Sequence, residues 1–347
     1  MDKVEIGVIG AGWWATTSHI PNLLTNPHVG GVAVTRPDRE NLDKVMERFG
    51  LAHGFTDAEE MLDSRPLSGV VIASPHVMHF NHTMMAIGRG LHVLVEKPMA
   101  TSAGDARAMV EAANGKSVEL IMPYGWNYKP MTDAAHCLVK EGWVGEIRHI
   151  SAQMASALAD LFAGEPMLET SEHLFRPPPS TWADPARAGG YGWGQLTHGL
   201  GLLFRLVDLA PARVYARLGL SPAEVDYYDA AIVEFENGAT MALSGAATVP
   251  KSRGFQVDIR IFGTEGMLLF DIERARVEAV RHDGKVHVEQ LAPDAGEYDT
   301  ASAISRFVDI CRGAGAENPA NGLIGQRATE VLDAMYRSAK SGRMEEV

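Results

Sequence analysis

Short apolar runs alternate with amphipathic segments along the first third of the chain. The apolar runs predict strands, whereas apolar residues spaced three and four positions apart predict helices. Strands that are apolar on both faces and alternate with helices indicate a doubly wound parallel sheet covered by helices, an α/β fold of the Rossmann type. The predicted strands are residues 4–10, 30–35, 69–74, 92–96 and 118–124, and the helical segments between them are residues 18–26, 39–50, 79–90 and 102–115.

The pattern changes at about Gly145, where strands with alternating apolar and polar residues replace the strand–helix alternation. Asn-Gly in "ENGA" and Asp-Gly in "HDGK" tolerate positive φ and predict hairpin turns. We therefore expect two domains, a dinucleotide-binding Rossmann domain over 1–123 and an α+β domain with a mostly antiparallel open sheet over 124–347. The strands predicted for the second domain are residues 146–154, 213–220, 230–247, 257–271 and 285–291.

Other segments of the second domain do not fit the strand pattern. Residues 195–209 and a pair of segments within 301–341 have helical spacing. Residues 172–190 are rich in Pro and Gly and predict an irregular loop suited to covering a cleft.

The composition limits the possible partners of the protein. Among 347 residues, 46% are hydrophobic and 22% are charged, which is ordinary for a soluble globular protein. The formal net charge of -13 argues against binding to a nucleic-acid backbone. No apolar run is long enough to span a bilayer, and the N-terminus lacks the pattern of a signal peptide. With only two cysteines, we expect a cytoplasmic protein that binds neither nucleic acid nor membrane.

The stretch "GVIGAGWWA" follows the first predicted strand and opens a helix. Gly10 and Gly12 match the first two glycines of a dinucleotide fingerprint, which allow a tight turn and close approach to a pyrophosphate, and Ala15 replaces the third. A glycine-rich turn in an unrelated α/β domain is the alternative. Trp13 and Trp14 are unusual at this place; we expect one to shield the coenzyme and the other to pack, without deciding between them.

The end of the second predicted strand bears on the choice of coenzyme. An acidic residue there would bind both ribose hydroxyls of NAD, whereas an arginine accommodates the phosphate of NADP. The chain has Thr35 and Arg36 at this end, and Asp38 lies two residues beyond. We therefore favour NADP(H) and keep NAD(H) as possible, with Arg36 as a solvated surface charge for the alternative.

Lys97 follows a buried strand directly, in the stretch "LHVLVEKPMA". An ammonium at the edge of a low-dielectric region is costly unless something uses it. Ligands of doubly wound sheets bind outside the carboxyl ends of the strands, so Lys97 is expected to face the nicotinamide end of the coenzyme.

The "EKP" at this position resembles the glucose-fructose oxidoreductase / inositol dehydrogenase (Gfo/Idh/MocA) family. The resemblance covers nearly the whole chain, and the order of its motifs makes it specific. Besides the fingerprint at 10–15 they are "SPHVMH" at 74–79, "VEKP" at 95–98, "GWNYKP" at 125–130, "GG…H" at 189–198, "VEFENGA" at 233–239 and "IFGTEG" at 261–266.

The resemblance implies catalytic residues. Lys97 would bind the reacting hydroxyl and assist proton transfer, with Glu96 ordering Lys97 or the coenzyme. His198 matches the histidine that the family places after an aspartate, but the position four residues earlier is Gly194, and Gln195 is the nearest polar residue. An aspartate would orient the imidazole and raise its pKa, so we expect His198 to bind substrate and to leave more of the proton transfer to Lys97.

The resemblance also implies binding residues. Coenzyme contacts are expected from Ser74, Pro75 and His79, and the substrate pocket from Tyr124, Trp126, Asn127 and Gln195. Such aromatic and amide groups suit the faces and hydroxyls of a sugar ring. Arg176, in the Pro-rich loop, would suit an acidic substituent. No metal site is expected, because three-residue steps turn His76, His79 and His82 away from one another on a helix.

Three functions remain open at this point. The first is an NAD(P)-dependent oxidoreductase that acts on a secondary hydroxyl or carbonyl of a sugar, polyol or sugar derivative. The second is an NAD(P)-dependent glycosidase that oxidises the sugar transiently and eliminates the aglycone, and the third is a non-catalytic coenzyme-binding regulator. An open sheet leaves one face to cover, so we also expect a homodimer or homotetramer formed through the C-terminal sheet.

Overall fold

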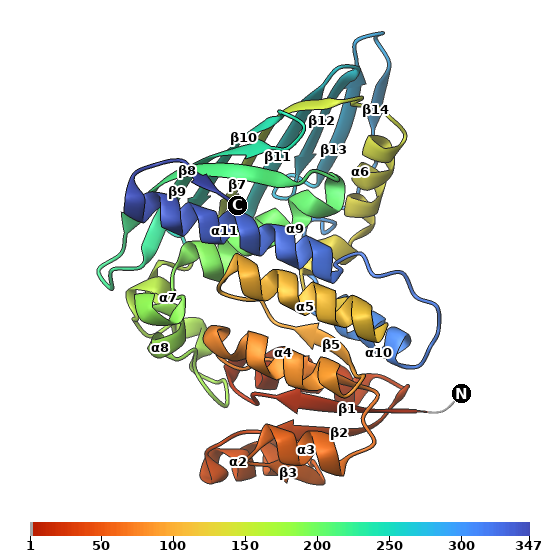
Figure 1. Cartoon of the computed structure of the whole chain (residues 1–347), viewed down its shortest axis with the longest axis vertical. Coiled ribbons are helices and arrows are strands. Elements are labelled where there is room, and N and C mark those ends of the chain that lie inside the picture. The colour runs from red at the N-terminus through yellow and green to blue at the C-terminus, as the bar shows by residue number, and fades with distance from the viewer. Residues whose placement is uncertain (1–2) are drawn as a thin grey trace. The chain divides into compact units, whose positions relative to one another are not determined.

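A computed structural model describes residues 3–347 (Figure 1). The chain divides into two compact units. The first unit contains the chain up to Gly125 together with Pro166–Thr181 and Thr300–Gln326, and the second contains the remainder. The first unit thus includes two segments that follow residue 123. The assignment of coenzyme binding to 1–123 and of substrate binding to 124–347 stays a prediction.

The first unit contains a six-stranded sheet within the described residues, in the order β3-β2-β1-β4-β5-β6, with every neighbouring pair parallel. The five predicted strands are present, but the structure adds β3, which is too short to show a periodicity. The strands are β1 (Val4–Ile9), β2 (Val29–Thr35), β3 (His53–Phe55), β4 (Gly69–Ile72), β5 (His92–Val95) and β6 (Leu120–Ile121).

Helices cover both faces of this sheet. Met61 of one helix fills the space that a side chain at Gly7 would occupy. Phe307 of another helix fills the corresponding space at Gly69. Gly7 is in register with Val70, so Gly69 points to the opposite face. The doubly wound parallel fold is therefore confirmed. Its helices are α1 (Ile20–Thr25), α2 (Arg39–Phe49), α3 (Ala58–Ser64), α4 (His79–Gly88), α5 (Ala103–Lys116) and α10 (Ser302–Cys311), with a π-helical turn η1 (Ala15–His19) before α1.

The second unit contains a nine-stranded sheet within the described residues, in the order β14-β13-β12-β11-β7-β10-β9-β8-β15. Only β7 and β10 pair in parallel among these described strands, so the sheet is mostly antiparallel, as expected. The sequence pattern missed β13 and β15. The strands are β7 (Ile147–Ala155), β8 (Pro211–Leu220), β9 (Asp226–Phe235), β10 (Thr240–Ala246), β11 (Gln256–Gly263), β12 (Gly266–Asp271), β13 (Arg276–Arg281), β14 (Val286–Val288) and β15 (Glu345–Glu346).

Both predicted hairpin turns are present. Gly238 has φ +82 between β9 and β10, and Gly284 has φ +89 between β13 and β14. Positive φ favours glycine at these positions because it has no Cβ. The turn at Gly238 fixes the register of β9 against β10, in which one side of β9 lies in the core and the other in solvent.

Helix α9 (Thr197–Leu206) packs on β7 of this sheet. A Cβ at Gly199 would lie 3.3 Å from the Cβ of Met154, so glycine allows the helix to approach the strand closely. A π-helical turn, η6 (Gly192–Leu196), precedes α9. The other described helices of this part of the chain include α6 (Pro130–Lys140) and α7 (Ala159–Ala163); α8 (Pro179–Trp182) and α11 (Gly322–Ser341) contain residues of both units.

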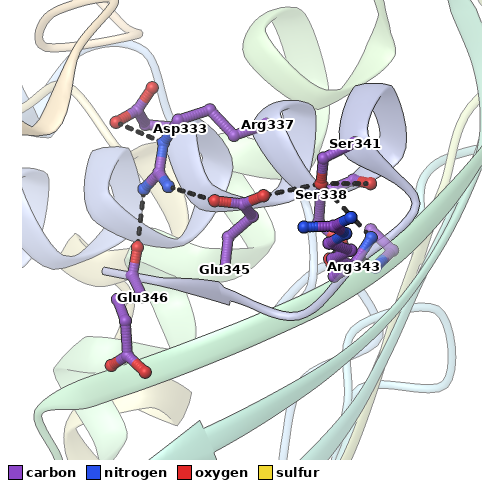
Figure 2. A network of polar contacts seen from close by, with 8 residues as sticks. Asp333, Arg337, Ser338, Ser341, Arg343, Glu345 and Glu346 are labelled. Atoms are coloured by element: carbon purple, nitrogen blue, oxygen red, sulfur yellow. Dashed lines mark hydrogen bonds and ion pairs between the residues drawn. The ribbon is translucent and has the colours of Figure 1, made fainter.

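The chain end closes one edge of the second sheet (Figure 2). β15 pairs antiparallel with β8, and Arg337 of α11 donates to the Glu346 carbonyl at 2.7 Å and to Glu345 at 3.1 Å. Ser338 Oγ accepts from the Ala216 amide of β8 at 2.9 Å. These bonds cover an edge strand that would otherwise offer unpaired backbone groups to another chain.

Within residues 3–347, the helices are all too short or too polar to cross a bilayer.

Candidate functional site

The fingerprint turn at the end of β1 is built from backbone hydrogen bonds. The amides of Gly10 and Ala11 donate to the Thr35 carbonyl of β2 at 3.2 and 2.9 Å. Gly10 has φ +93, and a Cβ there would lie 2.5 Å from the Ser74 amide nitrogen. By contrast, a Cβ at Gly12 would meet nothing closer than 3.9 Å. Protein packing does not require glycine at Gly12, but the close approach of a pyrophosphate to the backbone would.

Trp13 is held by the Pro-rich segment of the first unit. Its Nε1–H donates to His173 Nδ1 at 2.9 Å, and the two rings lie nearly parallel, with centroids 6.5 Å apart. The Trp14 ring meets Trp13 edge-on. The predicted loop over a cleft thus contacts the fingerprint turn directly, which the sequence pattern had not shown.

Arg36, at the end of β2, is half-buried and bonded within the same unit. Its Nη1 donates to the Ala11 carbonyl at 2.9 Å, and its guanidinium lies over the Phe175 ring, 4.1 Å from the centroid. Burial lowers the pKa of Arg36, opposed by the charge of Asp38. The Asp38 carboxylate caps the N-terminus of α2 by accepting from the amides of Glu40 and Asn41. Arg36 is therefore not a freely solvated charge, and Asp38 is engaged by its own helix.

Lys97 follows β5 and is buried beside a carboxylate and an imidazole. Burial lowers the pKa of Lys97 to about 8, opposed by the charge of Glu96. His19 Nε2 donates to Glu96 Oε1 at 2.8 Å, and Glu96 Oε2 accepts from the Lys97 amide at 3.1 Å. Burial raises the pKa of Glu96, but the hydrogen bond and charge of His19, together with Lys97, outweigh it and bring that pKa to about 2.

Sequence reasoning missed His19, the partner of Glu96. The residue lies in the π-helical turn η1, directly after the fingerprint. Such turns are common at functional sites, because the wider turn re-aims side chains that a regular helix would hide. The sequence pattern predicts a helix there without indicating its type.

His79 connects the two loops that carry other predicted coenzyme-binding residues. Its ring nitrogens lie 2.7 Å from the Pro98 carbonyl and 2.8 Å from the Ser74 carbonyl, and the ring is fully buried. Burial lowers the pKa of His79. The ring positions Ser74 relative to Pro98, while its predicted contribution to coenzyme binding stays a prediction. His82 bonds Ser74 Oγ instead, at 2.9 Å.

The second unit places His198 in an aromatic cluster. His198 Nδ1 lies 3.2 Å from the Tyr298 hydroxyl, and the Trp126 ring meets His198 edge-on at 6.2 Å. Asn127 donates to the Gly201 carbonyl of the same helix at 3.0 Å. Of the residues predicted for the substrate pocket, the structure therefore brings Trp126 and Asn127 to the helix of His198. Tyr298 had not been predicted.

The packing around Gly194 leaves no room for an aspartate side chain. A Cβ at Gly194 would lie 2.7 Å from the Phe162 ring and 3.2 Å from the Trp182 ring. No longer side chain fits without moving these rings, so the carboxylate of the family pattern has no room here. Gln195, the next residue, is buried in η6.

The remaining predicted residues lie in the first unit. Tyr124 is buried at its boundary, and Arg176 is exposed in the Pro-rich segment. Lys97 also belongs to this unit, whereas His198 and Trp126 belong to the second.

Models of one oxidoreductase family match both parts of the chain. A family model described as "Oxidoreductase family, NAD-binding Rossmann fold" matches residues 4–124, and the GFO/IDH/MocA C-terminal domain model matches residues 132–269. D-xylose 1-dehydrogenase (NADP(+)) 2 of Haloferax volcanii is 24% identical over 342 residues, which cover 97% of each chain. D-apiose dehydrogenase of Paraburkholderia graminis is 24% identical over 326 residues, covering 91% of this chain and 82% of its own.

A solved levoglucosan dehydrogenase, in complex with NADH and levoglucosan, shares the fold. It superimposes with a TM-score of 0.77 at 20% identity and covers 100% of both chains. The two family models together match both parts of the chain, and the two relatives named above are sugar dehydrogenases. The chain therefore belongs to the GFO/IDH/MocA family of NAD(P)-dependent, sugar-type oxidoreductases.

Proposed function

We propose that the protein transfers a hydride between a nicotinamide coenzyme and a secondary hydroxyl or carbonyl of a sugar, polyol or sugar derivative. The observation that carries this proposal is Lys97, buried after β5 with its pKa lowered to about 8. An amine with a pKa near the working pH suits general acid–base catalysis, because both protonation states are populated. The names of the dehydrogenases from Haloferax volcanii and Paraburkholderia graminis support a sugar-like substrate.

The residues of this chain have separate roles in the proposed reaction. The nicotinamide coenzyme, when bound, supplies the hydride acceptor or donor. Gly10 and Gly12 allow its pyrophosphate to approach the backbone at the start of η1. The neutral amine of Lys97 takes the proton of the substrate hydroxyl during oxidation, and the ammonium returns a proton during reduction. Glu96 stays ionised and holds the Lys97 backbone, and His198 and Asn127 bind substrate hydroxyls.

We further propose that NADP(H) is the preferred coenzyme and that NAD(H) is accepted less well. Arg36 is supported by the Ala11 carbonyl and the Phe175 ring at the strand end where the adenosine ribose is expected. A guanidinium so held loses little side-chain freedom when it grips a 2′-phosphate. Asp38 caps α2, so it does not supply the acidic group that would favour NAD.

A substrate panel followed by absorbance at 340 nm tests the proposed reaction. Aldoses, polyols and sugar acids are offered with each coenzyme, and aglycone release from glycosides is measured in parallel. We expect net coenzyme reduction with at least one sugar and its loss in Lys97→Met. Aglycone release without net coenzyme change would instead show redox-neutral glycosidase chemistry. Coenzyme binding without turnover of any panel member would favour a regulator.

We also propose that the protein assembles into a homodimer or homotetramer through the exposed face of the second sheet. Ile232 of β9 is 51% exposed and lies between Tyr215 of β8 and Ala242 of β10 in the strand register. An apolar row on an open sheet face is stabilised when a second copy covers it. Light scattering at micromolar concentration should give a multiple of the chain mass, reduced by Ile232→Glu. A monomeric mass for the wild type would refute the assembly.

A further inference from the structure

The segment 292–299 reaches the helix of His198 and is anchored beside it within the second unit. Trp126 Nε1 donates to the Gly296 carbonyl at 3.1 Å. A Cβ at Gly296 would overlap the Ile272 carbonyl oxygen, so glycine lets the segment lie against the end of β12. Two turns, from Ala295 N to the Ala292 carbonyl and from Glu297 N to the Asp294 carbonyl, bring the chain round to Tyr298.

Tyr298 is enclosed by aromatic rings. Its ring meets Trp126 edge-on with centroids 4.9 Å apart and His198 edge-on at 5.3 Å, and Phe255 lies 6.2 Å away. Phe255 also meets Trp126 edge-on, at 5.4 Å. Such edge-to-face contacts fix a ring more firmly than area burial alone. The hydroxyl is thereby held 3.2 Å from His198 Nδ1.

We propose that Tyr298 is a positioning residue that sets the orientation and tautomer of the His198 imidazole in place of a carboxylate. The inference rests on the proposed function for its catalytic meaning. Gly194 has no room for the aspartate of the family pattern, and the Tyr298 hydroxyl lies at one of the two ring nitrogens that such a partner would address.

The exchange of a carboxylate for a phenol changes what the imidazole can do. A carboxylate only accepts hydrogen bonds, so it holds a proton on the facing ring nitrogen and stabilises the imidazolium. A phenol is neutral at pH 7 and can either donate to Nδ1 or accept from Nδ1–H. With a phenol at Nδ1, the other ring nitrogen of His198, Nε2, can donate to a substrate carbonyl or accept from a substrate hydroxyl. The net charge of the imidazole is the same in both cases. His198 then adapts to both directions of the reaction, and Lys97 carries the net proton.

Nitrogen-15 NMR of histidine-labelled protein tests the assignment independently of turnover. The chemical shifts of Nδ1 and Nε2 report which nitrogen carries the proton, and His198→Gln identifies the His198 signals. Tyr298→Phe removes one oxygen atom and keeps the ring, so folding should be retained, which a melting curve checks. We expect the His198 tautomer populations or their pH titration to change in Tyr298→Phe. Tyr227→Phe removes a phenol hydroxyl that donates to the Ala159 carbonyl at 2.6 Å and not to His198, so it should leave the His198 tautomer as in the wild type.

Kinetics give the second readout. Tyr298→Phe should lower kcat about tenfold, the effect expected from loss of one neutral hydrogen bond, and change the pH dependence of kcat, while the dissociation constant of the coenzyme stays within about twofold of the wild-type value. Identical His198 spectra and pH profiles in wild type and Tyr298→Phe would overturn the inference. If the spectra change but no sugar is turned over by the wild type, the proposed function fails while the assignment of Tyr298 to the His198 ring stands.

Discussion

Each unit buries a small group of neighbouring acidic or basic side chains, with opposite electrostatic results. In the first unit Glu96 faces His19 and Lys97, and its pKa falls to about 2 in spite of burial. In the second unit Asp226 and Asp229 face each other on β9, and burial raises the pKa of both, well above its usual range for Asp229. Burial alone therefore does not decide whether a carboxyl group is ionised; the charge and hydrogen bonds of its neighbours do.

The hydrogen bonds of the second pair are unevenly shared. Asp226 accepts from the Gly192 amide at 2.6 Å and from the Tyr336 hydroxyl at 2.7 Å. Among the described residues, Asp229 finds no hydrogen-bond donor, so the neutral, protonated form of one carboxyl group is favoured. A Cβ at Gly190 would overlap Asp226 Oδ1, so this pair supports the backbone from which η6 and His198 follow. Glu96 thus lies beside Lys97, the predicted catalytic residue, whereas Asp226 and Asp229 support the backbone that precedes η6.

The largest expected effect comes from removing the side-chain amine of Lys97. Lys97→Met should lower kcat by roughly 10²–10⁴-fold, the range of a positioned proton-transfer group, while coenzyme affinity changes little. Lys140→Met, on the exposed end of α6, is the matched control. Steady-state rates and a coenzyme fluorescence titration measure both quantities. Retention of most activity would remove Lys97 from the chemistry.

Glu96→Gln should alter both pH dependence and stability. Oxidation requires the neutral amine of Lys97, so the wild-type rate should rise as pH increases through about 8. The charge of Glu96 raises that pKa, so its removal should move the midpoint to lower pH. The low pKa of Glu96 in the fold stabilises the protein at pH above its ordinary value of 4.5, and this contribution is lost as pH falls toward 2.

Loss of the ionic hydrogen bond in Glu96→Gln should cost about 2 kcal/mol in the free energy of unfolding at pH 7. Denaturant titrations at pH 7 and pH 4 measure it, and the difference between wild type and variant should shrink at the lower pH. An unmoved pH–rate midpoint would show that Glu96 does not tune Lys97.

Asp229→Asn tests the like-charged pair. A raised pKa in the fold means that the folded state keeps a proton that the unfolded chain releases, so this pair destabilises the wild type increasingly as pH rises above 3.8. Asparagine needs no such proton. The free energy of unfolding of the variant should therefore exceed that of the wild type by about 1.5 kcal/mol at pH 8 and by less at pH 5. Melting curves at both values measure the gain. Asp208→Asn, with a side chain 91% exposed, should show no such pH dependence.

The smallest expected effect concerns the coenzyme. Wild type should bind NADP about tenfold or more tightly than NAD, equivalent to at least ~1.4 kcal/mol, and Arg36→Asp should reverse the order. Arg39→Asp is the matched control, because the Arg39 side chain is 70% exposed and paired with Asp43. Phe175→Leu should reduce the preference for NADP over NAD, because the Arg36 guanidinium loses the ring that holds it. Dissociation constants for both coenzymes decide the matter, and tighter NAD binding by the wild type would contradict the proposal.

The periodicities recovered most of the longer elements, because a strand buried on both faces and an amphipathic helix each leave a regular pattern. They missed, among other described elements, β3, α3, α6, β13 and β15. β3 and α3 are short, with three and seven residues, and the charged ends of β13 interrupt its apolar alternation. The π-helical form of η1 and η6 was also not indicated, since the sequence pattern of such a turn matches that of a regular helix.

The sequence by itself determined the fold class, the family and the residues expected to carry the chemistry, because Gly10, Lys97 and His198 stand in motifs of fixed order. Only the tertiary structure decided their partners. His19 reaches Glu96 from 77 positions away, and Tyr298 reaches His198 from 100 positions away. No local periodicity encodes such pairs, because they arise when separate elements pack and exclude water from the polar groups between them. That packing sets which buried groups are charged, and so which of them can exchange a proton near neutral pH.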